Sequence, residues 1–140
     1  MSLCFLSLET NKIFNQLILK NLQENGFDGL SEALIIVFPF IEEYENITVS
    51  QLSKKVGYSR QAMHKNIKKL EEFDYIKLTE LNQKEKSINF TTKGKELMSK
   101  ANSFIKSVEK DISTLVGKEE LEKYKNTQSK LFDYLNGKLN

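Results

Sequence analysis

The segment ENITVSQLSKKVGYSRQAMHKNIKKLEEFDYI, Glu45–Ile76, decides the fold because it contains two helical patterns on either side of Gly57. Thr48 or Ser50 can cap the first helix, since a hydroxyl at that position accepts a hydrogen bond from a free backbone N–H. The inward residues of this short helix are Leu52 and Val56. Glycine then supplies a tight turn, which predicts that a second helix follows at once.

Ser59 can cap this second helix, which is strongly amphipathic. Its predicted buried face consists of Ala62, Met63, Ile67 and Leu70. The other face carries Arg60, Gln61, His64, Lys65 and Lys68. Arg60 and His64 are the only arginine and the only histidine of the chain. A helix, a glycine turn and an amphipathic helix are typical of the helix-turn-helix motif.

Two alternating segments follow the second helix. DYIKLTEL, residues 74–81, and SINFT, residues 87–91, each read as a strand, and the polar NQKEK between them reads as a turn. Strands joined by so short a turn form a β-hairpin. We therefore expect a winged helix-turn-helix over residues 46–91.

Helical spacing returns on both sides of this segment. We expect helices over residues 9–24, 31–44, 92–116 and 118–139, with GFDG and Gly117 as breaks. Pro39 should kink or shorten the second of them. The predicted fold class is mainly α with a small β-hairpin. Residues 1–140 should form one domain in which 1–45 and 92–140 supply core and dimerisation helices.

Positive charge is concentrated in the middle of the chain. Eleven basic and five acidic residues lie between Gln51 and Lys95, a net charge of +6, whereas the whole chain carries +2. A localised basic segment suits a polyanion, although an ordinary solvated face has the same composition.

The second helix has the side chains that read DNA in the major groove. The Arg60 guanidinium can donate two hydrogen bonds to guanine, which lysine cannot imitate, and Gln61 can read adenine. The alternative for Arg60 is an exposed helix start without a partner. The remaining candidates for contact with a base or a phosphate are Ser50, Lys54, Lys55, Ser59, His64, Lys65, Lys68, Lys84 and Lys86.

The chain resembles the winged-helix MarR family of bacterial transcription regulators. The resemblance is carried by residues 47–78, the basic turn after them and the segment INFTTKG. The junction Phe90–Gly94 is similar to the family's Leu-Thr-x-x-Gly. Asn82-Gln83-Lys84 departs from the Asp-x-Arg of the family's wing, and Asp74 stands in a tight turn where the family often has glycine. The resemblance implies a homodimer on a pseudo-palindromic duplex, and the apolar flanking helices independently favour pairing.

Two features bear on control of such a regulator. Cys4 lies at the start of the first helix and resembles the cysteine of the family's peroxide-sensing branch, although Leu8 replaces a tyrosine and free cysteine is often a small buried hydrophobe. Four aromatic residues can border a pocket for a small aromatic effector or can belong to the core. They are Phe14, Phe38, Phe40 and Tyr44.

Other classes of function lack support in the sequence. One histidine and one cysteine do not make a zinc site, and no phosphate loop or nucleophile–base spacing indicates an enzyme, so no cofactor is expected. No long apolar run or signal peptide is present, and with one cysteine this favours the cytoplasm. The main hypothesis is a sequence-specific DNA-binding repressor released by a ligand or by oxidation. The alternative is a winged-helix module that binds a protein.

Overall fold

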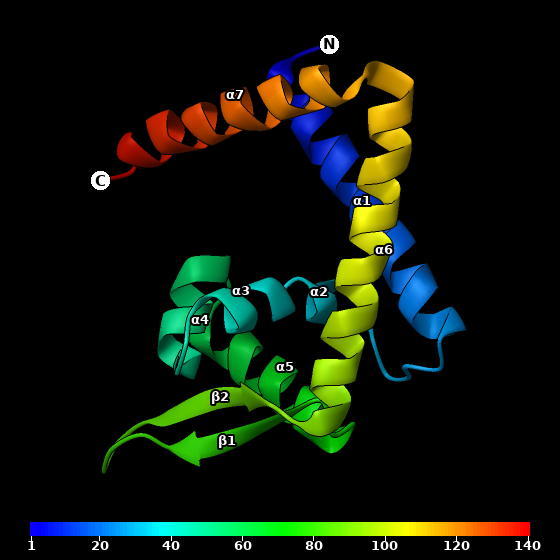
Figure 1. The fold of residues 1–140 in the computed structure, drawn as a ribbon. Coiled ribbons are helices and arrows are strands. Elements are labelled where there is room, and N and C mark those ends of the chain that lie inside the picture. The colour runs from blue at the N-terminus through cyan, green and yellow to red at the C-terminus, as the bar shows by residue number, and fades with distance from the viewer. The chain divides into compact units, whose positions relative to one another are not determined.

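The computed structural model describes residues 1–140, which form two compact units, Met1–Asn102 and Ser103–Asn140. Seven helices and one hairpin make up the chain (Figure 1). Their bounds are α1 Leu3–Glu24, α2 Glu32–Ile35, α3 Phe38–Glu43, α4 Val49–Val56, α5 Arg60–Glu72, β1 Ile76–Glu80, β2 Lys86–Phe90, α6 Thr92–Val116 and α7 Lys118–Gly137. The predicted fold class is confirmed.

Two helices differ from their predicted extent. α1 begins at Leu3, earlier than the predicted residue 9, because the Ser2 hydroxyl caps it by accepting a hydrogen bond from Phe5 N at 3.1 Å. The helix expected over residues 31–44 is divided into α2 and α3. Pro39 lies in the first turn of α3, where its missing N–H leaves no intrahelical partner unsatisfied.

The hairpin is attached to the chain that precedes α4. β1 and β2 pair antiparallel from Ile76 opposite Phe90 to Glu80 opposite Lys86. On the other side of β2, Ile88 N donates a hydrogen bond to Ile47 O at 2.8 Å, and Thr48 forms an isolated bridge with Ser87. The hairpin is therefore held to the start of α4 as well as to itself.

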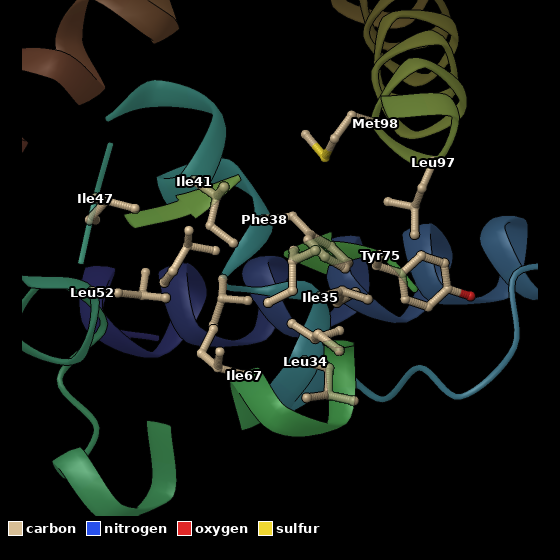
Figure 2. Packing of buried hydrophobic residues seen from close by; sticks show 14 of the residues in the cluster. Leu34, Ile35, Phe38, Ile41, Ile47, Leu52, Ile67, Tyr75, Leu97 and Met98 are labelled. Carbon is tan, nitrogen blue, oxygen red and sulfur yellow. The ribbon is translucent and has the colours of Figure 1, made fainter. Parts of the chain in front are cut away.

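The core of the first unit gathers side chains from α1 to the first turns of α6 (Figure 2). Phe38 packs edge-on against Tyr75, with ring centroids 6.3 Å apart, and also against Phe90. The Tyr75 hydroxyl donates to Asp28 O at 2.6 Å, and burial raises the pKa of this phenol, so it remains a donor. This one side chain therefore joins the loop after α1 to the core.

One predicted core residue is exposed. Ala62 was expected on the buried face of α5, but only Met63, Ile67 and Leu70 are buried there. These three residues define a narrow stripe with helical spacing, and Ala62 lies about 100° around the helix from Met63. The sequence pattern predicted a wider buried face than α5 has.

The end of α5, the start of β1 and the start of α6 meet at a close backbone approach. A Cβ atom added to Gly94 would lie 2.0 Å from the Tyr75 carbonyl oxygen. Thr91 N donates to the same oxygen at 3.1 Å, and the Thr91 hydroxyl accepts from Gly94 N at 3.0 Å. Asp74 takes up the turn before it with φ 64°, the left-handed conformation that its place in the family pattern implied.

We expect Gly94→Ala to reduce the free energy of unfolding by about 3 kcal/mol, because the added methyl group must displace backbone rather than a flexible side chain. Urea denaturation would measure the change. Gly137→Ala is the matched control, since a methyl group added there would meet no atom within 4 Å and alanine favours a helix. Equal stability of Gly94→Ala and the wild type would show that the approach is not tight.

Candidate nucleic-acid interface

Local hydrogen bonds fix where α4 and α5 begin. Thr48, rather than Ser50, caps α4: its hydroxyl accepts from Gln51 N at 3.2 Å, while Gln51 Oε1 accepts from Thr48 N at 3.0 Å. Gly57 ends α4 in the left-handed conformation, with φ 85°. Ser59 then caps α5 as predicted, because its hydroxyl accepts from Ala62 N at 3.1 Å.

The buried stripe of α5 determines which side chains face solvent. Gln61, Lys65 and Lys68 lie opposite that stripe, His64 lies beside them, and Arg60 lies at the edge of the stripe in the first turn of the helix. All five side chains are exposed, and none of them forms a salt bridge or an intramolecular hydrogen bond. The structure therefore brings five predicted contact residues together on one helix and leaves their polar groups free.

The other predicted contacts lie on α4 and on the hairpin. Ser50 is half-buried in the first turn of α4, and Lys54 and Lys55 are exposed in its last turn. Lys55 Nζ lies 3.9 Å from the centroid of the Tyr44 ring, a cation–π contact that the sequence did not indicate. Ser59 is exposed at the cap of α5.

Lys84 and Lys86 are exposed at the end of the hairpin, which extends away from the helices of its unit (Figure 1). Neither lysine forms a salt bridge. The sequence did not indicate the role of Asn82 within this loop. Its side-chain oxygen accepts hydrogen bonds from the backbone N–H groups of Lys84 and Glu85. Asparagine in a polar turn is the only sequence signal for such a role.

The residues predicted to sense a signal do not form one cluster. Cys4 is exposed in the first turn of α1. Phe14 is half-buried on α1, Phe40 packs against the core, and Tyr44 is exposed with the Lys55 ammonium over its ring. Phe38, for which the sequence allowed a pocket or the core, is only 2% exposed and belongs to the core, because Tyr75 and Phe90 enclose its ring.

An open cleft of about 1010 Å³ lies elsewhere in the first unit. It is formed by the end of α3, the hairpin and the first turns of α6, and none of the four aromatic residues lines it. Charged and polar side chains contribute much of its wall, including Glu42, Lys77, Asn89 and Lys95. No group of His, Cys, Asp and Glu side chains is arranged to hold a metal ion, and none of the helices has the length and apolar character of a membrane span.

Comparison with known proteins places this geometry in a class. The family model described as winged helix-turn-helix DNA-binding matches residues 40–77. A MarR/EmrR family transcriptional regulator from Acinetobacter sp. ADP1 is 22% identical, with a TM-score of 0.67 over 95% of this chain and 96% of that one. No curated protein sequence matches significantly.

Two further solved structures are similar over most of their length. The MepR–DNA complex of S. aureus is 17% identical, with a TM-score of 0.74 over 96% of this chain and 98% of that one. The S. aureus MarR structure with salicylate and kanamycin is 16% identical, with a TM-score of 0.76 over 93% of this chain and 87% of that one.

The chain is therefore a winged helix-turn-helix protein. Its fold is that of the MarR-type transcription regulators, including the helices that flank the winged segment. The resemblance seen in the sequence is confirmed.

We expect Ser59→Ala to lower the free energy of unfolding by about 1 kcal/mol, because the first turn of α5 loses its cap. Ser59→Asp is the matched control: its carboxylate can accept the same hydrogen bond, so stability should be retained. Thermal and urea denaturation of both variants would test this. A Ser59→Ala protein as stable as the wild type would mean that water replaces the cap without cost.

Proposed function

We propose that the protein is a sequence-specific transcription regulator that binds double-stranded DNA. The observation that carries this proposal is the exposed face of α5, where Arg60, Gln61, His64, Lys65 and Lys68 have no intramolecular polar partner. A helix with such a face fits the major groove of B-form DNA. The competing function is that of a winged-helix module that binds another protein. Binding to another protein does not explain why this face of α5 combines one guanidinium group with unpaired lysines.

The proposed roles follow from side-chain chemistry. Arg60 and Gln61 would read base edges, because their planar groups can form paired hydrogen bonds with guanine and adenine. Lys54, Lys84 and Lys86 would contact phosphates and so set affinity rather than sequence preference. Such a regulator uses no catalytic residue and no cofactor, and it acts where the genome lies, which for a bacterial cell is the cytoplasm.

We also propose that the protein acts as a homodimer and that residues 1–45 and 92–140 supply its dimerisation helices. The first half of α1 exposes Leu3, Phe5, Leu6 and Leu8, of which Leu8 is 61% exposed. In the second unit, α7 exposes Phe132 and Leu135 and buries none of its residues. Apolar areas of this kind indicate a protein interface. A two-fold dimer would present two α5 helices about one turn of DNA apart.

A repressor of this type needs a signal that releases it from DNA. We propose two candidates for this signal. The exposed Cys4 thiol is accessible to peroxide. A small aromatic effector is the second candidate, since a solved structure of the same fold contains salicylate. Unchanged DNA affinity after stoichiometric peroxide would eliminate the first. Thermal-shift assays with phenolic acids would test the second.

Fluorescence-anisotropy titration is the experiment that tests DNA binding. The probe is a duplex from upstream of the protein's own coding region, compared with a shuffled duplex at two salt concentrations. Preference for the native duplex, with affinity that falls as salt rises, would support the regulator. No binding to either duplex at low salt would favour the protein-interaction module.

Arg60→Ala should cost about 1–3 kcal/mol of binding free energy and relax specificity at one base pair, because a bidentate contact is lost. Lys84→Ala is the comparison: it should weaken binding to all sequences alike and reduce the salt slope by about one. Anisotropy with a set of single-base variants of the preferred duplex would separate these effects. If Arg60→Ala weakened every duplex equally, its role in base readout would be wrong.

A further inference from the structure

His64 is the only histidine of the chain, and it lies among the candidate contact residues of α5. Its side chain is exposed and forms neither a salt bridge nor an intramolecular hydrogen bond. Histidine is the residue type whose charge ordinarily changes between pH 5 and 8. The exposed face of α5 therefore combines permanent cations with a single imidazole.

The position of His64 on α5 favours a contact with the DNA backbone. His64 lies one turn after Arg60 and one turn before Lys68, on the flank of the outward face rather than at its centre. A helix in the major groove directs the centre of its outward face to base edges and its flanks to the sugar–phosphate walls. The imidazole is therefore better placed for a phosphate than for a base.

The protein supplies no counter-charge for a protonated His64. On α5 itself, the charged residues within one turn are Arg60, Lys65 and Lys68, and the first carboxylate, Glu71, lies two turns away. The elements that pack against α5 are α4, α2 and β1. Their charged residues are Lys54, Lys55, Glu32, Lys77 and Glu80. None of these carboxylates forms a salt bridge with the imidazole, so a negative partner for it has to come from another molecule.

We propose that His64 binds a DNA phosphate as an imidazolium, so that α5 takes up a proton from solvent when it enters the groove. This inference rests on the proposed function, because the phosphate is the counter-charge that the protein lacks. A charged N–H donor forms a stronger hydrogen bond with phosphate than a neutral one does. By linkage, a reaction that takes up a proton is favoured as the pH falls. The affinity for DNA therefore rises at lower pH.

The test measures the affinity of the full-length protein for a set of duplexes by fluorescence anisotropy, at about pH 7.5 and at about pH 5.5. The wild type should bind about 3- to 10-fold more tightly at the lower pH for each α5 helix that contacts DNA, because an imidazole is mainly charged there. The salt slope should also be steeper at the lower pH, by about one for each helix, because one more phosphate is neutralised.

Two substitutions at position 64 separate charge from shape. His64→Gln removes the only imidazole of the protein but keeps an N–H donor, so the response to pH should disappear. His64→Lys carries a permanent charge, so it should bind more tightly than the wild type at about pH 7.5 and show no response to pH. Lys65→Gln is the matched control on the same helix. It should weaken binding by the same factor at both pH values and leave the response intact.

Three results would overturn the proposal: wild-type affinity that does not change with pH, a His64→Gln variant that keeps the full response, or a response confined to duplexes with one particular base pair. The last of these would place the proton at a base edge. An absence of DNA binding by the wild type at both pH values would refute the proposed function itself, so the two failures are distinguishable. Circular dichroism melting of each variant at both pH values would show whether the fold had changed.

Discussion

The contact between Gly94 and the carbonyl of Tyr75 is the constraint on which the winged unit depends. Two short connections of the chain meet at this point. One leads from α5 into β1, and the other leads from β2 into α6. Only a residue without a side chain permits this approach. Lys93 adds to the junction by donating from Nζ to Phe73 O at 2.8 Å, where α5 ends, and a cation there also favours the helix dipole.

This junction matters because α5 must be held at a defined angle if it is to read a groove. One end of α5 is set by the Ser59 cap and the Gly57 turn, and the other by Phe73 and Asp74. Between them, Met63, Ile67 and Leu70 press the helix against the core. The side chains on the outward face of α5 therefore make no polar contact that stabilises the fold. Under the proposed function, the unpaired polar groups of this face would contact DNA rather than stabilise the fold.

Local signals in the sequence were sufficient for the fold class and for the exposed positions of most candidate contact residues. Glycine, serine and proline act through their own backbone chemistry, so the Gly57 turn, the Ser59 cap and the break near Pro39 could be predicted. The exposed position of Ala62 could not be predicted, and neither could the choice between pocket and core for Phe38, because each depends on where another element packs. The cation–π contact of Lys55 with Tyr44 and the bonds of Asn82 are tertiary or loop geometry, and no periodic pattern encodes them.

The hydrogen bonding of β2 to the chain before α4 affects whether the hairpin can pair with a strand of another molecule. The bond from Ile88 N to Ile47 O covers part of one edge of the two-stranded sheet and leaves β1 as the open edge. β1 has only five residues and carries Lys77 and Glu80. Short, charged edges are poor templates for strand addition. The hairpin is thereby protected from pairing with another sheet, and it can remain extended in solution without promoting aggregation.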